Sequence, residues 1–96
     1  MGDILPAVLR TLGLDRKFEE GRLRREWHGV VGDALARRSR PRFVKGGRLF
    51  IAVENNAWMQ EIRFHQREIV ERVRELFPDL DIHEIRLTLE REKDEA

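Results

Sequence analysis

The hydrophobic positions of this chain recur first at helical spacing, and they divide its N-terminal part into two predicted helices. Near the N-terminus the apolar stripe consists of Ile4, Leu5, Val8, Leu9 and Leu12. Asp3 precedes this stripe as a predicted N-cap, and Gly13 stands where the helix would end. A second stripe runs over residues 15–38, and Gly29 and Gly32 predict a bend or break within it.

After Pro41 the pattern becomes typical of a β-hairpin. Residues 42–45 and 48–54 flank Gly46-Gly47, and a glycine pair between two such runs predicts a two-residue turn. With the turn placed there, three pairs of residues oppose each other: Lys45 and Arg48, Val44 and Leu49, Phe43 and Phe50. Opposed side chains share a face, so the two phenylalanines are expected to lie together.

The C-terminal part predicts one long helix and one further strand. Asn55 or Asn56 caps a helix over about residues 57–77, and Pro78 ends it. The apolar stripe of this helix consists of Trp58, Ile62, Ile69, Val73 and Leu76, with Met59, Val70 and Phe77 beside it. Residues 82–90 then alternate as a strand, with Ile85, Leu87 and Leu89 on one face. Trp27 and Trp58 both belong to helical stripes, so both are expected to be mainly core.

The order of predicted elements is α-α-β-β-α-β, which indicates a two-layer α+β domain with a three-stranded sheet and helices on one face. A length of 96 residues allows one modest core, so residues 1–90 are expected to form a single domain, with a charged tail over residues 91–96. One face of the sheet should then be open.

The register of the hairpin predicts which side chains lie on each face of the sheet. The core face is expected to hold Val44, Leu49, Ile51 and Val53, continuing into Ile85, Leu87 and Leu89. The other face would show Phe43, Phe50, Ala52, Lys45 and Arg48, with Glu84, Arg86 and Thr88 from the last strand. Two adjacent phenylalanines edged by cations are typical of a platform on which unpaired bases stack. The alternative is that the N-terminal helix covers this face and makes both phenylalanines part of the core.

Charge is distributed unevenly along the chain. The net charge is +1, yet residues 1–48 carry twelve Lys/Arg against six Asp/Glu, and residues 49–96 carry seven against twelve. Either a basic half meets an anionic partner, or the two halves neutralise each other in the fold. Six cations and no acidic residue lie between residues 37 and 48: Arg37, Arg38, Arg40, Arg42, Lys45 and Arg48. They are candidates for contact with nucleic-acid phosphate, with Phe43 and Phe50 available for stacking; helix-end stabilisation and protection of a strand edge are the alternatives.

Several classes of protein are excluded or made improbable by the composition. The absence of cysteine excludes disulfides and thiolate metal sites, and no signal peptide or apolar run long enough for a membrane span is present, which predicts a cytoplasmic protein. His28, His65 and His83 lack metal-ligand spacing, and Ser39 has no nucleophile motif. We therefore expect no enzyme, no cofactor and no metal. Gly29-Val30-Val31-Gly32 matches the Gly-x-x-Gly of KH domains, but its valines are in phase with the helical stripe, which favours burial.

The ordered combination of Trp27, Val31-Gly32, Pro41, Leu49, Val53 and Trp58 resembles the DciA family of bacterial replicative-helicase loaders, formerly catalogued as a domain of unknown function. The resemblance covers about residues 12–89. It implies a KH-like fold and a non-enzymatic role, in which the domain binds the hexameric replicative helicase, assists its loading on single-stranded DNA and has DNA affinity of its own. A KH-like RNA-binding module in RNA or ribosome metabolism is the competing interpretation. The sequence indicates neither the oligomeric state nor which surface would meet a helicase.

Overall fold

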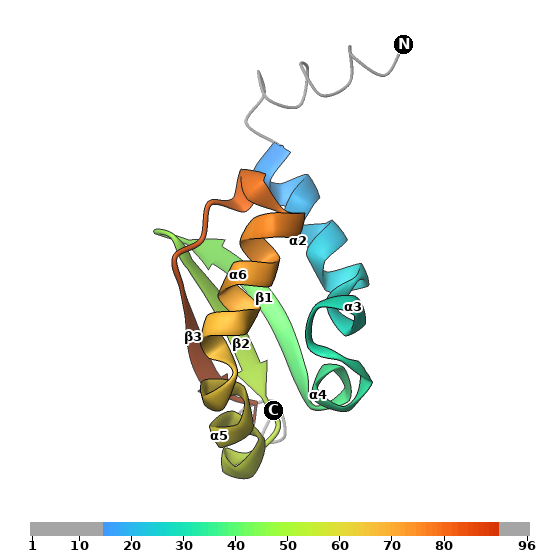
Figure 1. Ribbon diagram of the computed structural model, residues 1–96, viewed down its shortest axis with the longest axis vertical. Helices are drawn as coiled ribbons and strands as arrows, with labels where there is room; N and C mark the ends of the chain where they lie inside the picture. Colours follow the sequence, from blue (N-terminus) through green and yellow to red (C-terminus); the bar gives the residue numbers. More distant parts are fainter. Residues whose placement is uncertain (1–14, 91–96) are drawn as a thin grey trace.

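The computed structural model describes residues 15–90, which form five helices of α type, one short 3₁₀ helix and three strands (Figure 1). In chain order they are α2 (Asp15–Arg25), α3 (Trp27–Val31), α4 (Asp33–Arg38), β1 (Ser39–Lys45), β2 (Arg48–Val53), α5 (Asn56–Phe64), α6 (Gln66–Leu76), η1 (Pro78–Leu80) and β3 (Glu84–Leu89). The helix predicted over residues 3–12 and the tail over residues 91–96 lie outside the described residues.

The three strands form one mixed sheet in the order β1-β2-β3. β1 and β2 are antiparallel and join at Gly46-Gly47, and the three predicted pairs of opposed residues are confirmed. β2 and β3 are parallel, because the chain crosses over through α5 and α6 before it returns to the sheet. β1 begins at Ser39, three residues earlier than predicted, and Pro41 lies within it. An edge strand tolerates proline because its outward N–H position needs no partner in the ladder.

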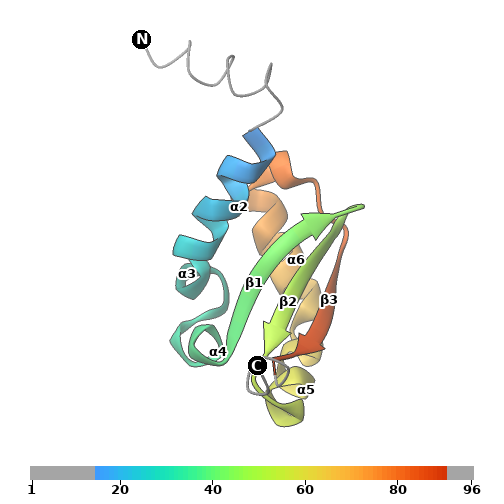
Figure 2. The same ribbon diagram turned by 180° about the vertical axis from the view of Figure 1, so that it is seen from behind.

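All helices within residues 15–90 lie on one side of the sheet, so that helices and strands form two layers (Figures 1 and 2). The prediction of a two-layer α+β domain is therefore confirmed, and the arrangement is compatible with a KH-like fold. The core between the layers includes the predicted strand positions Val44, Leu49, Ile51, Val53 and Ile85, all buried, while Leu87 and Leu89 are half-buried against it. No helix between residues 15 and 90 is long and apolar enough to cross a membrane.

The helical stretch over residues 15–38 is broken at two points. The first break follows Arg25, and the second falls at Gly32, whose φ of 90° ends α3 and begins α4. Trp27 is 3% exposed, and its indole Nε1–H donates to the Ser39 hydroxyl at 3.0 Å. That hydroxyl donates in turn to the Leu35 carbonyl at 2.7 Å. These two bonds fasten α3 and α4 to the start of β1.

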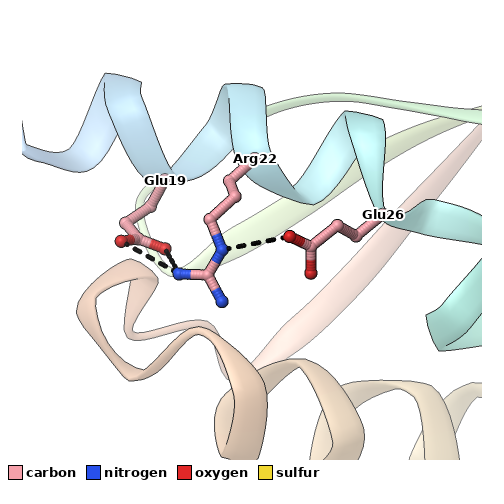
Figure 3. Close-up of polar contacts among 3 residues, drawn as sticks. All are labelled: Glu19, Arg22 and Glu26. Atoms are coloured by element: carbon pink, nitrogen blue, oxygen red, sulfur yellow. Dashed lines mark hydrogen bonds and ion pairs between the residues drawn. The ribbon is translucent and has the colours of Figure 1, made fainter.

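A second set of contacts fastens α2 to the C-terminal half of the chain. Arg22 lies between Glu19 and Glu26, whose carboxylates approach its guanidinium to 3.1 and 3.3 Å (Figure 3). The same guanidinium lies 4.7 Å from the centroid of the Phe77 ring, which is fully buried. Arg22 thus covers an aromatic core residue, and its guanidinium is paired with two nearby carboxylates, those of Glu19 and Glu26.

The single long helix predicted after the hairpin is two helices, because the helix ends at Phe64 and restarts at Gln66. The break coincides with a gap in the apolar stripe, since His65 takes the position between Ile62 and Ile69 that faces the core, and Phe64 is exposed. The His65 N–H bonds to the Ile62 carbonyl at 3.0 Å, a tightened turn that allows α6 to change direction over the core. Asn55 is confirmed as the cap of α5, since its side chain accepts from the Trp58 N–H.

Two predicted core positions differ from expectation. Leu76 is 47% exposed, and the neighbouring Phe77 takes the buried place at the end of α6. Trp58 is half-buried rather than core, and the Arg38 guanidinium lies 5.6 Å from its ring centroid. Trp58 lies in the first turn of α5, at the end of the sheet, where the core covers only one side of the indole.

The glycine turn of the hairpin is held against the segment that precedes β3. The Gly47 carbonyl accepts the His83 N–H at 2.7 Å, and a Cβ added at Gly47 would lie 2.9 Å from the His83 ring. Arg74 of α6 holds that segment in place, because its guanidinium donates to the Ile82 carbonyl at 2.9 Å and contacts the His83 Nδ1 at 3.0 Å. Both glycines have positive φ, 60° for Gly46 and 77° for Gly47.

Replacing Trp27 should destabilise the domain far more than replacing Trp58. We expect Trp27→Ala to lower the free energy of unfolding by roughly 3–5 kcal/mol, because it empties a buried site and removes a hydrogen bond to Ser39. Trp58→Ala should cost clearly less, since that indole is already partly exposed to water. Urea denaturation of both variants measures the difference. Equal losses would show that Trp58 contributes to the core as fully as Trp27.

The two glycines of the turn should respond differently to alanine. Gly46→Ala should cost about 1–2 kcal/mol, the ordinary penalty for a left-handed residue with a side chain. Gly47→Ala should cost more, because the new methyl group also meets the His83 ring. Adding His83→Ala to Gly47→Ala should recover the excess, as measured by urea denaturation of the four variants, His83→Ala alone included. A Gly47→Ala cost no larger than that of Gly46→Ala would contradict the close approach.

Candidate nucleic-acid interface

The six predicted cations lie on three consecutive elements along the edge and tip of the hairpin, and all are exposed. Arg37 and Arg38 end α4, Arg40, Arg42 and Lys45 lie on β1, and Arg48 begins β2. The hairpin therefore brings these residues along one side of the sheet, as the sequence predicted. Some of the six nevertheless have acidic neighbours in the fold.

Three of the six cations form ion pairs with carboxylates from distant parts of the chain. Arg38 lies 3.0 Å from Glu54, Arg40 lies 3.1 Å from Glu90, and Arg48 lies 2.7 Å from Glu84. Residues 37–48 contain no carboxylate because these partners come later in the chain: Glu54 follows β2, Glu84 begins β3 and Glu90 follows β3, the strand that pairs with β2. Within residues 15–90, no ion pair is formed by Arg37, Arg42 or Lys45.

The two phenylalanines of the hairpin stack on each other on the open face of the sheet. Their ring centroids are 4.7 Å apart with an angle of 25° between the planes. Phe43 is 44% exposed and Phe50 is half-buried. The strands stand in front of the helices in Figure 2, and no helix of the described part covers this face. The alternative that the N-terminal helix covers it concerns residues outside the described range.

The third strand adds charge to the same face. Arg86 pairs with Phe50 in the parallel register, and Glu84 pairs with Arg48. The Glu84 carboxylate lies 2.7 Å from the Arg48 guanidinium and 3.3 Å from that of Arg86, so one anion holds two cations. Thr88 is exposed there as well. The aromatic pair is therefore edged by Lys45 at the hairpin tip and by Arg86 across β2.

Ala52 lies on this face, as the register predicted, but it is buried there rather than exposed. It is 1% exposed because the Arg40–Glu90 ion pair joins the strand on one side of β2 to the end of the strand on the other. In the register, Ala52 lies opposite Arg40 and beside Thr88, so the paired side chains pass over its methyl group. A larger residue at this position would separate them.

A local distortion in β1 sets the direction of Arg42. The register shifts between Pro41 and Phe43, so Arg42 is an extra residue with no partner on β2. The bulge restores the alternation that places Val44 in the core and Phe43 outside. Its backbone is held by α2: Arg24 donates to the Arg42 carbonyl at 2.8 Å, and the Glu20 carboxylate accepts the Val44 N–H at 3.3 Å.

The Gly-x-x-Gly stretch does not form a phosphate clamp. Val30 is 4% exposed and Val31 is half-buried against the core, as their phase with the helical stripe predicted. The histidines lie in different elements, and the carboxylates within reach of the His65 ring are Glu61 and Glu68 of its own helical segment. Among residues 15–90 no group of three His, Asp or Glu side chains could hold a metal ion.

Sequence reasoning missed Arg24 and Arg25 of α2. Neither lies in the basic run of the hairpin, and on their own they are typical of the cations that end a helix. The helical spacing did carry a signal: residues 24, 25 and 28 are spaced so that their side chains lie close together on a helix. Helix α2 lies along the edge strand β1 (Figure 2).

Fold and surface together define an α+β domain with an open sheet face that combines stacked aromatic rings and cations. The family model described as "Dna[CI] antecedent, DciA" matches residues 1–87, nearly the whole sequence. The chain therefore belongs to the DciA family, as its tryptophans, glycines and hairpin residues indicated.

Three bacterial relatives of this chain are each named "UPF0232 protein". Those of Rhodococcus jostii (strain RHA1) and Corynebacterium glutamicum (strain R) are each 26% identical over 87 residues, which are 91% of this chain and 46% and 49% of theirs. The protein of Mycolicibacterium smegmatis is 25% identical over 73 residues, 76% of this chain and 38% of its own length. The chain thus spans about half or less of the length of these relatives.

Proposed function

We propose that this domain is a non-enzymatic adaptor that binds single-stranded DNA through the open face of its sheet and assists the loading of the bacterial replicative helicase. The observation that carries the DNA-binding part is the stacked pair of Phe43 and Phe50 on an uncovered face edged by cations. The helicase part rests on membership of the DciA family.

Stacking on Phe43 suits an unpaired base better than a duplex. A base in a duplex has both faces covered by its neighbours, whereas a single-stranded base can lay one face on the exposed ring. Each stacked base contributes roughly 1–3 kcal/mol, with little dependence on sequence. A helicase loader needs a contact of this kind, because it has to act on whichever strand is opened.

The electrostatic part of the contact falls mainly to three cations. Arg38, Arg40 and Arg48 are already held by carboxylates, so phosphate would compete with those partners. Arg37, Arg42 and Lys45 have no such competitor within residues 15–90. Three neutralised phosphates on a single strand correspond to a slope of log K against log[salt] near −2, from roughly −0.7 for each.

Two double variants should separate charge from stacking in one experiment. Arg42→Gln with Lys45→Gln should flatten the salt slope by about 1–1.5, because fewer counterions are released. Phe43→Ala with Phe50→Ala should weaken binding by roughly 1–3 kcal/mol per stacked base and leave the slope unchanged. Fluorescence anisotropy with a short single-stranded oligonucleotide across a salt series measures both quantities.

Phe64→Ala is the matched control for the aromatic variant, since Phe64 is 83% exposed at the end of α5, outside the proposed surface. It should bind as the unaltered chain does. Absence of binding at low salt would overturn the proposed DNA contact, and equal losses in the control would show that exposed aromatic area matters wherever it lies.

Immobilised chain should capture the replicative helicase from a nuclease-treated bacterial lysate. The nuclease removes bridging through DNA, so recovery would indicate direct contact, which purified helicase should reproduce in size-exclusion chromatography. A parallel capture uses a lysate without nuclease. Recovery of ribosomal proteins from both lysates, of RNA from the untreated one, and of helicase from neither would instead favour the RNA-binding alternative. A KH-like domain in RNA metabolism would give that second result.

A further inference from the structure

A cationic groove of about 510 Å³ lies between helices α2, α3 and α4 and the edge strand β1. Its walls carry five basic side chains, Arg24, Arg25, His28, Arg37 and Arg40, and no carboxylate. They come from α2, α3, α4 and β1, so that only the folded chain assembles them. Of the four arginines, Arg37 and Arg40 belong to the basic run of the hairpin, and Arg24 and Arg25 extend the cationic surface around the edge of β1.

Three carboxylates close to Arg24 and Arg25 in the sequence are bound to other groups. Glu19 and Glu26 are bound to Arg22, and Glu20 accepts the Val44 N–H. Arg24 uses its guanidinium on the Arg42 carbonyl, a neutral acceptor that leaves its full charge in place. Within residues 15–90, Arg25 and Arg37 form no ion pair, and Glu90 on Arg40 is the one anion bound to a lining arginine. The groove therefore retains an excess of positive charge.

The floor of the groove is rigid. Buried Trp27 and Ser39 line it, and the hydrogen bonds from the indole to the Ser39 hydroxyl and from there to Leu35 fix both side chains. Two of the lining guanidinium groups are also held before a ligand arrives, that of Arg24 by the Arg42 carbonyl and that of Arg40 by Glu90. An open, arginine-lined groove differs from small-molecule pockets, which are mostly apolar and enclosed.

We propose that this groove binds phosphate groups of the same nucleic-acid strand whose bases stack on Phe43 and Phe50. The inference rests on the proposed function and adds the course of the strand. Arg40 and Pro41 line the groove, Arg42 follows at the bulge, and Phe43 lies on the open face. A strand that leaves the aromatic pair thus meets Arg42 and then the groove as it crosses the edge of β1.

Removing two lining charges should test the groove directly. We expect Arg25→Gln with Arg37→Gln to weaken binding of a 5′-hydroxyl single-stranded oligonucleotide at least about tenfold at low salt, and to flatten the salt slope by about 1–1.5. Arg63→Gln with Arg67→Gln is the matched control, because it removes the same charge from exposed positions on α5 and α6. The control should change both quantities much less. Lysine at positions 25 and 37 should retain the slope.

A second readout does not depend on DNA. The indole N–H signal of Trp27 should shift when inorganic pyrophosphate is added to the unaltered chain, and it should not shift in the Arg25/Arg37 variant. Comparison of 5′-phosphorylated and 5′-hydroxyl oligonucleotides identifies the source of the phosphate: equal affinity indicates the internal backbone, and tighter binding of the phosphorylated strand indicates its end. Phosphate binding in the groove would be contradicted if the Arg25/Arg37 variant binds DNA as the Arg63/Arg67 control does and the Trp27 indole signal does not shift with pyrophosphate. Failure of the unaltered chain to bind any strand would overturn the proposed function instead.

Discussion

The register of the β1–β2 hairpin is the constraint on which both the core and the open face depend. Side chains alternate along a strand, so a slip of one residue would send Phe43 and Phe50 into the core and bring Val44 and Leu49 out of it. Two features hold the register. The first is the glycine pair, because the Gly47 carbonyl accepts a hydrogen bond from the segment before β3. The second is the bulge at Arg42, whose backbone carbonyl is bound by α2. Core packing and the aromatic pair are therefore consequences of the same few contacts.

Local rules were sufficient wherever a feature depends on neighbours in the sequence. The glycine turn, the opposed pairs, the Asn55 cap and the break at Gly32 all follow from backbone preferences of short segments. The break at His65 had a local signal too, the missing apolar position between Ile62 and Ile69, but a continuous helix was the simpler expectation. Burial of Trp27 followed from its stripe, whereas the half-burial of Trp58 depends on where the sheet ends.

Features that depend on distant segments could not be read from the sequence. Whether an arginine meets a carboxylate is decided by which strands become neighbours, and β3 reaches β2 only after the crossover through α5 and α6. The burial of Ala52 beneath the Arg40–Glu90 pair and the cationic groove have the same origin. The resemblance to the DciA family supplied a class of function and agreed with the fold that the element order predicts, but it carried no information on how the charges pair.

The two interpretations of the uneven charge prove to be complementary. All three ion pairs of the basic run join an arginine of the first half to a glutamate of the second, so the halves do neutralise each other in part. Such exposed pairs contribute only about 0–1 kcal/mol each to stability. Their larger effect is on position, since they hold guanidinium groups over the sheet and reduce its net field. Neutralisation on the open face leaves the excess charge at the edge of β1 and in the groove, where a polyanion would meet Arg25, Arg37 and Arg42, which form no ion pair within residues 15–90.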